Sequence, residues 1–348
     1  MTKLKVLTQN IGIDVAKDSF VACLSYLLFD REIKFVSVQN FKNNSEGFTA
    51  FSDWFKRYLA TEADLYFTME ATGVYYEHLA YYLFGENYQV SVVQATQASN
   101  YKKSESQSSK TDKLDAKSLS RMGLERKLSL WKPTSEYYLL LRDLTRERSA
   151  LIKDKTRLRN QIHALNHSMH LHPLRKELIE ERIGLIKSQI KTLDKKIKHH
   201  LTKESKDYQD VSQKIKNVLS IPGVGHTVVA TVVAETDGFA KTHSVRQLIS
   251  YAALSIDHSE SGDMKGKSKM KKKGNKHIKG VLFCPAFSSI RVSEDIRAFY
   301  DRVAQGRNGR AATLAVCRKV LTLIYTLWKN NTSYDSNYIK KGATSCPS

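Results

Sequence analysis

Two apolar runs in the first part of the chain each end on an acidic residue, and this pattern constrains the fold most strongly. Ile11-Gly12-Ile13 is followed by Asp14, and the run 65–69 is followed by Glu70. Short apolar runs bounded by polar turns are typical of buried strands. Asp112 and Asp115 are three residues apart in a helical stretch, so they share one face of that helix. We expect a fold that brings two strand ends and one helix together.

The surrounding pattern predicts the order of elements in this region. Strand-like runs cover 6–15, 20–29 and 33–38, and a helical pattern then begins near Ser45. The strand that ends at Glu70 follows, then a helix over about 75–84, a strand over 89–94 and the helix with the two aspartates. The order βββαβαβα is that of the RNase H fold, in which the first strand, the fourth strand and the last helix converge their acidic ends. We therefore predict an α/β RNase H-like domain over residues 1–130.

The acidic residues predict a site for a divalent metal ion, Mg²⁺ or Mn²⁺. Carboxylate oxygens are hard ligands that suit Mg²⁺, and two-metal phosphoryl transfer uses acids that bridge and flank the ions. Single residues have other interpretations, because Asp14 could belong to a turn and Asp112 could cap its helix. Four acids on matching elements favour the metal site. The predicted metal ligands and catalytic acids are Asp14, Glu70, Asp112 and Asp115.

The charge of the chain favours a polyanionic partner. Lys and Arg number 56 against 35 Asp and Glu, which leaves a net charge of +21 and a pI of about 9.6. Such a surplus favours nucleic acid through counterion release, although a basic protein without that role is the alternative. No apolar stretch approaches the roughly 20 residues of a membrane span, and no secretory pattern begins the chain. We expect a cytoplasmic protein with no membrane partner and with reduced thiols, since its cysteines form no CxxC pair.

The segment 131–210 predicts two long helices. Leucines recur every seven residues from Leu144 to Leu165, and an isoleucine-rich series from Ile179 to Ile197 alternates steps of four and three. These are the a and d positions of coiled-coil seams, with a break around residues 170–173. The two helices could fold back as a hairpin or pair between chains, and the pattern leaves both open. We predict a coiled-coil helical insertion.

The segment 211–333 predicts a mostly α-helical domain, followed by a loose tail over 334–348. Pro222-Gly223-Val224-Gly225 is typical of a helix-hairpin-helix turn, whose backbone N–H groups can bind a phosphate. A tight connection between helices is the alternative. A polar, lysine-rich loop over 255–274 indicates a segment that grips a phosphate backbone. The predicted nucleic-acid-binding residues are Gly223, Gly225, Lys265, Lys267, Lys269, Lys271, Lys272, Lys273 and Lys276.

The same loop contains Ser259 and Ser261. A serine nucleophile needs a lowered pKa or a stabilised alkoxide, and neighbouring cations or metal ions can supply both. On the residues alone, either serine is a loop residue.

These motifs together resemble the IS110-type transposases, a group that includes the Piv site-specific invertases. The segments 11–17, 69–73 and 110–116 resemble the DEDD domain of that family. The segments 221–225 and 251–254, and Ser261-Gly262 through Lys273-Gly274-Asn275, resemble its C-terminal transposase domain. The resemblance covers about residues 8–330. One departure lies before the Ser-Gly pair, where the family often has Gly-Leu-x-Pro and this chain has Ala253-Leu254-Ser255-Ile256.

The resemblance implies an insertion-sequence transposase or site-specific recombinase with a RuvC-like, Mg²⁺-binding nuclease domain. It implies an essential serine that attacks a DNA phosphate and forms a covalent intermediate, and the matching position is Ser261, with Ser259 as the alternative. It further implies double-stranded donor and target DNA, a structured noncoding bridge RNA that pairs with both, and a homo-oligomer, either dimer or tetramer. Such a protein would act in the prokaryotic cytoplasm, at the nucleoid.

Two other functions remain open on the sequence. A metal-dependent, structure-specific endonuclease, similar to a Holliday-junction resolvase, would use water and form no covalent adduct. A nucleic-acid-binding protein without catalysis would not need the four acids. The serine loop and the C-terminal domain favour the recombinase over the endonuclease.

Overall fold

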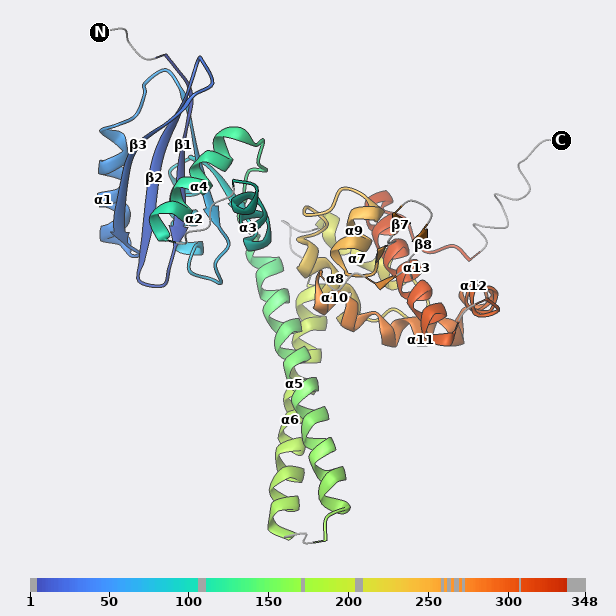
Figure 1. Ribbon diagram of the computed structural model, residues 1–348. Coiled ribbons are helices and arrows are strands. Elements are labelled where there is room, and N and C mark those ends of the chain that lie inside the picture. The colour runs from blue at the N-terminus through green and yellow to red at the C-terminus, as the bar shows by residue number, and fades with distance from the viewer. Residues whose placement is uncertain are drawn as a thin grey trace, which may run out of the picture. The chain divides into compact units, whose positions relative to one another are not determined.

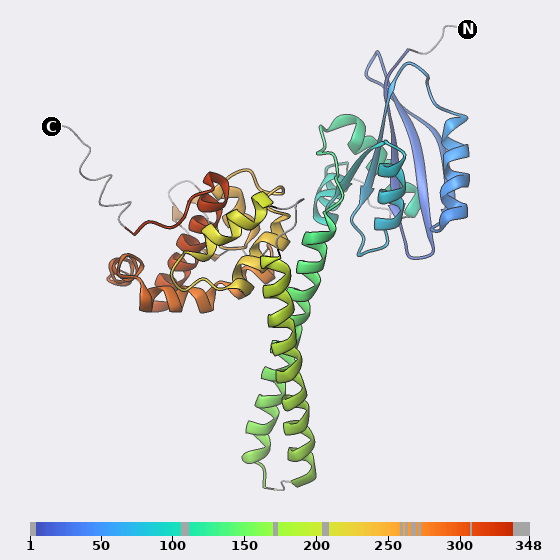
Figure 2. The same ribbon diagram turned by 180° about the vertical axis from the view of Figure 1, so that it is seen from behind.

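The computed structural model describes residues 5–105, 111–169, 173–203, 209–257, 260–261, 264–265, 269–270, 273–306 and 308–336. The chain forms two compact units, Met1–Pro133 and Thr134–Ser348, which are drawn from two sides in Figures 1 and 2. The predicted segments 131–210 and 211–333 lie almost entirely in the second unit. The four-part division of the sequence stays a prediction.

The first unit is built on a five-stranded sheet. The strands are β1 (Val6–Val15), β2 (Ser19–Leu28), β3 (Ile33–Lys42), β4 (Asp64–Glu70) and β5 (Gln89–Val93), in the order β3-β2-β1-β4-β5. The first three form an antiparallel meander, whereas β4 is parallel to β1 and β5 is parallel to β4. This mixed sheet fits the RNase H-like fold that the sequence predicts.

One face of the sheet carries an aromatic core under α1 (Ser45–Lys56) and α2 (Glu77–Gly85). The helix α1 begins at Asn44, whose side chain accepts a hydrogen bond from the backbone N–H of Gly47, as an N-cap does. Phe51 lies fully buried at its centre and makes an edge contact with Phe20 of the sheet, with ring centroids 5.2 Å apart. The odd-numbered apolar residues of β1 point into this core, so its even-numbered residues face the other side.

The other face of the sheet is covered by α4 (Asp112–Glu125), whose backbone lies almost directly on β1. A side chain at Gly12 would place its Cβ closer than 3 Å to the backbone nitrogen of Ser120 and the carbonyl oxygen of Ala116. Farther along the helix, Gly123 lies equally close to the side chain of Asn10. The helix therefore runs antiparallel to β1, and its first turn lies at the end of β1.

A further helix, α3 (Ala95–Ser104), lies between β5 and α4 and is absent from the predicted order. The observed order of the first unit is βββαβαβαα. This helix is mostly polar, and its contact with the unit rests on two buried residues, Ala98 and Tyr101. Two apolar positions in ten residues are too few for a periodic signal, so the sequence pattern missed it.

The second unit begins with a long antiparallel hairpin of α5 (Glu136–Asn166) and α6 (Pro173–Thr202), visible in both ribbon views (Figures 1 and 2). Far from the core of the unit, the two predicted seams meet in a cluster that contains Leu158, Leu165, Ile179 and Ile183. The helices therefore pack against each other within one chain. Of the two arrangements that the heptad pattern leaves open, the structure of the single chain shows the hairpin.

The remaining helices of the second unit surround α8 (His226–Thr236) and α13 (Gly309–Asn330). They are α7 (Gln209–Leu219), α9 (Val245–Tyr251), α10 (Lys276–Val281), α11 (Phe283–Val292) and α12 (Glu294–Ala304). The helices α10 and α11 are consecutive and meet at Leu282.

The helix α13 is long and apolar enough to cross a membrane by length and composition. Its most apolar window is 56% buried, and residues such as Val320 and Ile324 are fully buried in the core of the unit. That burial is what a core helix of a soluble protein shows, so this helix is weak support for a membrane span.

The predicted polar loop over 255–274 contains two short antiparallel strand pairs. The strand β6 (Ile256–Asp257) pairs with β9 (Lys269–Met270), and β7 (Glu260–Ser261) pairs with β8 (Met264–Lys265). Because the second pair is nested inside the first, the segment goes out and returns as a β-hairpin. We call the two strand pairs, β6 with β9 and β7 with β8, the serine hairpin.

The close contact at Gly12 gives a stability prediction. We expect Gly12→Ala to lower the free energy of unfolding by about 1–3 kcal/mol or more, because the new methyl group must displace backbone that cannot rotate away. Gly85→Ala is the matched control, since a Cβ there meets nothing within 4 Å. Urea denaturation of both variants measures the difference, and equal stabilities would contradict the contact.

Candidate active site

Asp14 and Glu70 lie side by side at the ends of two parallel strands. The register pairs Ile13 with Met69, so the acidic residues that follow are neighbours. Met69 points into the aromatic core, and the next residue on each strand therefore faces α4. The strand order thus brings together two carboxylates that are 56 positions apart in the sequence.

The helix α4 adds Asp112 and Asp115 from its first turn. Its N-cap is Thr111, whose side chain accepts a hydrogen bond from the backbone N–H of Leu114 at 3.3 Å. The capping role considered for Asp112 is therefore filled by its neighbour. Asp115 is 8% exposed, whereas Asp112 is exposed. Acidic residues are stabilised in a first turn by the helix dipole, so these two aspartates suit the helix as well as the site.

The pKa of Asp14 responds to the other three predicted acids. The pKa of the Asp14 carboxyl is raised from 3.8 to about 6, by burial in the first place and then by charge repulsion from Asp115, Asp112 and Glu70. The positive charge of Lys102 opposes this rise. A carboxyl shifted by its neighbours in this way is a common property of functional sites.

The cation nearest to these acids is Lys102 of α3, whose Nζ lies 3.0 Å from Oδ1 of Asp115. Within the ranges that the structure describes, no three side chains of His, Cys, Asp or Glu are close enough to hold a metal ion. The donors nevertheless fit a hard divalent ion in kind, since all are carboxylates. The ammonium group at Asp115 shows that a cation is stabilised at this place. Sequence reasoning missed Lys102, because a lysine in a polar stretch carries no local signal of its partner.

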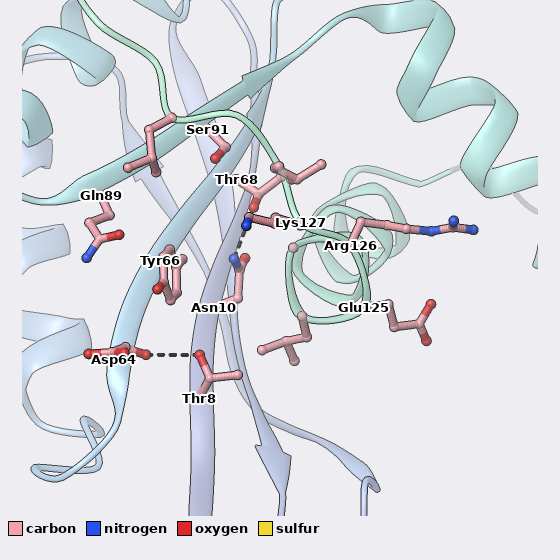
Figure 3. A pocket seen from close by; sticks show the side chains of 14 residues that line it. Thr8, Asn10, Asp64, Tyr66, Thr68, Gln89, Ser91, Glu125, Arg126 and Lys127 are labelled. Carbon is pink, nitrogen blue, oxygen red and sulfur yellow. Dashed lines mark hydrogen bonds between the residues drawn. The ribbon is translucent and has the colours of Figure 1, made fainter.

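A polar cavity of about 500 Å³ lies elsewhere in the first unit, next to the C-terminal end of α4 (Figure 3). Its lining includes Thr8 and Asn10 of β1, Thr68 of β4 and Ser91 of β5, and Oδ1 of Asn10 is buried without a hydrogen-bond partner. None of the four predicted carboxylates lines it. Figure 3 shows Asp64 and Thr8 at one end of the cavity. These two residues lie near the first residues of β4 and β1, whereas Glu70 and Asp14 lie near the last.

In the second unit, Ser261 is the last residue of β7 and pairs with Met264 of β8. It is therefore the last paired residue before the connection of the inner strand pair. Lys265 and Lys269 lie on the returning strands of the serine hairpin, and Lys273 and Lys276 are exposed beyond it. Four other predicted residues lie outside the described part of the chain: Ser259, Lys267, Lys271 and Lys272.

The two ends of the hairpin segment are joined by a buried hydrogen-bond network. The backbone N–H of Asn275, after the hairpin, donates to the carbonyl of Tyr251, before it, at 2.6 Å. The Asn275 side chain donates to Oε2 of Glu235 at 2.7 Å, and the Tyr251 hydroxyl donates to the Glu235 carbonyl at 3.0 Å. Gly274 is needed beside this network, since a side chain there would meet Ala253 closer than 3 Å.

Glu235 is the buried charge in this network, with only 2% of its side chain exposed. Arg146 of α5 binds it with two hydrogen bonds, Nε to Oε1 at 2.7 Å and a terminal nitrogen to Oε2 at 3.0 Å. Burial acts to raise the pKa of Glu235, but the hydrogen bonds from Arg146 and Asn275 lower it overall. A charge-assisted bidentate pair of this kind satisfies a buried carboxylate. The sequence signal for this network is an isolated Glu near the end of an apolar helix.

The two glycines of the predicted phosphate-binding turn differ in their surroundings. A Cβ at Gly223 would lie closer than 3 Å to the backbone nitrogen of Ser289, and the Ser289 hydroxyl donates to the carbonyl of Pro222 at 2.6 Å. Helix packing alone accounts for this glycine, which also has a φ of +84°. Gly225 precedes α8 and has open space around it. Phosphate binding by this turn stays a prediction.

Comparison with known families decides the identity of the chain. A family model described as a transposase, the DEDD domain of IS110 elements, matches residues 11–170. A second, described as "Transposase IS116/IS110/IS902 family", matches residues 215–301. The chain belongs to the IS110 family of transposases. It is therefore an enzyme of DNA recombination, and its DEDD domain suggests a divalent metal ion.

Individual proteins agree with the IS110 assignment. The chain is 29% identical over 335 residues to a pilin gene-inverting protein of Moraxella bovis, covering 93% of this chain and 97% of that protein. It is 28% identical to a pilin gene-inverting protein of Moraxella lacunata with the same coverage. A solved Holliday junction resolvase of fowlpox virus covers 34% of this chain and 95% of its own, at 13% identity and a TM-score of 0.24. That structural likeness is too slight to bear on function.

The raised pKa of Asp14 gives a pH-dependent prediction. Between pH 3.8 and about 6, folded Asp14 holds a proton that the unfolded chain has released. The free energy of unfolding therefore falls as the pH rises through this window. In the metal-free protein, we expect Asp14→Asn to be more stable than the native chain at pH 8 by on the order of 1–2 kcal/mol, and equal to it at pH 4.

Urea denaturation in the presence of a chelator at both pH values measures this effect. Asp18→Asn is the control, because Asp18 is exposed and is absent from the interactions at Asp14. A stabilisation by Asp14→Asn that is the same at pH 4 and pH 8 would show that the charge of Asp14 is not its cause.

Proposed function

We propose that this IS110-family enzyme cuts and rejoins DNA through a serine-linked covalent intermediate, assisted by divalent metal bound at Asp14, Glu70, Asp112 and Asp115. The observation that supports the proposal is that the register of β1 and β4 and the first turn of α4 place these acids at one end of the sheet, where the pKa of Asp14 is raised. Four carboxylates that repel one another are unfavourable for stability, and a bound cation would offset that cost. The family membership supports the same chemistry.

The metal ion, Mg²⁺ or Mn²⁺, would stabilise the negative charge that develops on a phosphodiester during transfer. The residues of the chain then have separate tasks. Asp14 and Glu70 sit on rigid strands and define the position of the site, whereas Asp112 and Asp115 come from a helix whose depth is set at Gly12. A site held on regular elements keeps its geometry during the reaction.

Ser261 would be the nucleophile in the second unit. Its Oγ forms a bond to phosphorus, its proton passes to a base, and the oxygen of one adjacent deoxyribose leaves as a hydroxyl group. The reverse attack by a deoxyribose hydroxyl releases the serine and joins the new strand. No external energy source is needed, because the phosphoserine ester retains the energy of the broken bond. The end of β7, beside lysine-bearing strands, supports this assignment.

The proposed partners are double-stranded donor and target DNA, a structured bridge RNA and further copies of the chain in a dimer or tetramer. The net charge of +21 supports polyanionic partners, and the RNA and the oligomer rest on the family resemblance. The predicted contacts lie at Gly223 and Gly225 and at the lysines of the serine hairpin and its flanks. The inversion named for the Moraxella relatives is the same class of strand exchange. This activity would place the protein in the cytoplasm of a prokaryote.

The acidic site can be tested by single substitutions. Asp14→Asn, Glu70→Gln, Asp112→Asn and Asp115→Asn should each lower strand exchange at least about 100-fold, because each removes a charged ligand. Glu77→Gln is the control, an exposed acid in the first turn of α2. Exchange is measured on cognate DNA, with its RNA where one is required, and folding is checked by circular dichroism. Near-native exchange by Asp115→Asn would reject the four-ligand site.

The serine chemistry can be tested by trapping the adduct. Denaturing a reaction on labelled DNA should leave DNA bound to the native protein, and Ser261→Ala should abolish the adduct while nucleic-acid binding changes by less than about threefold. Loss of the adduct in Ser259→Ala but not in Ser261→Ala would move the nucleophile by two residues. Cleavage without any adduct would establish the hydrolytic endonuclease instead.

A further inference from the structure

Lys102 forms an ion pair inside the acidic site, although it belongs to neither strand nor to α4. Its Nζ lies 3.0 Å from Oδ1 of Asp115, and the two side chains are only 23% and 11% exposed. Ion pairs at exposed positions contribute little because water screens them. Partial burial of both groups strengthens the attraction, so this pair has more effect than a surface contact.

The position of Lys102 is set by contacts between α3 and α4. The neighbouring Tyr101 is buried, and its hydroxyl donates to Oε2 of Glu125 at 2.7 Å. One turn later, Glu105 accepts a hydrogen bond from the Ser118 hydroxyl at 2.5 Å. These contacts hold both ends of the last turn of α3 against α4. The ammonium group is therefore presented to the acids by a fixed helix.

Acids of three elements, α4, β1 and β4, interact electrostatically near the Lys102–Asp115 ion pair. Asp115 and Asp112 of α4 and Glu70 of β4 disfavour the ionised form of Asp14 on β1, whereas Lys102 favours it. One ammonium group among four carboxylates leaves an excess of negative charge when the acids are ionised. The excess attracts a divalent ion, but one carboxylate oxygen is already engaged by the lysine.

We propose that Lys102 is the internal counter-ion of the acidic site, and that it competes with the divalent metal ion for Asp115. This inference rests on the proposed metal site and adds its regulation. In the metal-free protein the lysine offsets the repulsion that the clustered acids create. A metal ion that binds all four acids must displace the ammonium group, so the chain holds metal less tightly than the acids alone would. Because the ammonium group binds Oδ1 of Asp115 in the metal-free protein, Lys102 is a positioning residue for that carboxylate.

The test compares two adjacent lysines. Lys102→Met removes the ion pair, and Lys103→Met removes the same charge from the next position, which is exposed. Isothermal titration of the full-length, metal-free protein with Mn²⁺ should show a Kd about fivefold lower for Lys102→Met, equivalent to about 1 kcal/mol. Lys103→Met should stay within about twofold of the native value. Lys102→Arg, which keeps the charge, should bind Mn²⁺ as the native chain does.

Thermal unfolding without metal supplies a second readout. Lys102→Met should lower the Tm at pH 8, where the acids are ionised, and saturating Mn²⁺ should remove the difference. A role in packing alone would lower the Tm with and without metal and would leave the Kd unchanged.

The competing outcomes are separate. Weaker Mn²⁺ binding by Lys102→Met, or equal effects of Lys102→Met and Lys103→Met, overturns the counter-ion role and leaves the metal site intact. Mn²⁺ binding that Asp14→Asn does not weaken rejects the metal site itself, and the competition with it.

Discussion

The backbone contact between α4 and β1 is the constraint on which the acidic site depends. Glycine at position 12 lets the helix lie directly on the strand, at a depth that any side chain would prevent. The Ser120 hydroxyl then donates to the carbonyl of Asn10 at 2.8 Å, which ties the helix to the strand at a second point. The close approach of α4 to β1 and its antiparallel direction together bring the first turn of the helix to Asp14. Close packing with few voids makes such a contact rigid.

This arrangement is electrostatically unfavourable for Asp14. Asp14 is held where burial and like charges disfavour its ionised form, which is a state that folding alone would avoid. The pairing of Lys102 with Asp115 reduces that cost in the metal-free protein. Sites that carry out chemistry commonly retain such unfavourable features because the reaction needs them. The four acids and the lysine therefore interact electrostatically as one group, in which negative charge is in excess.

In the second unit, the buried charge of Glu235 is fully paired. Glu235 is almost fully enclosed, but Arg146 and Asn275 satisfy both of its oxygens. Because Asn275 follows the serine hairpin and Tyr251 precedes it, the network closes the base of that segment. The hairpin itself can then be polar and lysine-rich without weakening the core. Removal of one partner would leave a buried charge unpaired. The resulting loss of stability is larger than the net stabilisation that the pair itself provides.

The sequence by itself determined the five strands of the first unit and its helices other than α3, the two long helices, and the acidic residues at strand ends. These follow from local periodicity, because side chains repeat every two residues on strands and every 3.6 on helices. The resemblance to the IS110 transposases rests on short motifs instead, and both family models confirm the family. Site roles for the four acids and for Ser261 remain predictions, since no comparison tests single residues.

Only the tertiary structure decided which distant residues meet. The polar helix α3 and the partner of Lys102 depend on packing against α4, and the network at Glu235 joins three helices and a turn. The heptad pattern also did not decide whether α5 and α6 fold back on each other, since a partner chain can bury an apolar seam just as well. The structure shows the two seams in contact within one chain. Partners of buried charges are set by contacts between distant segments, and no local pattern encodes them.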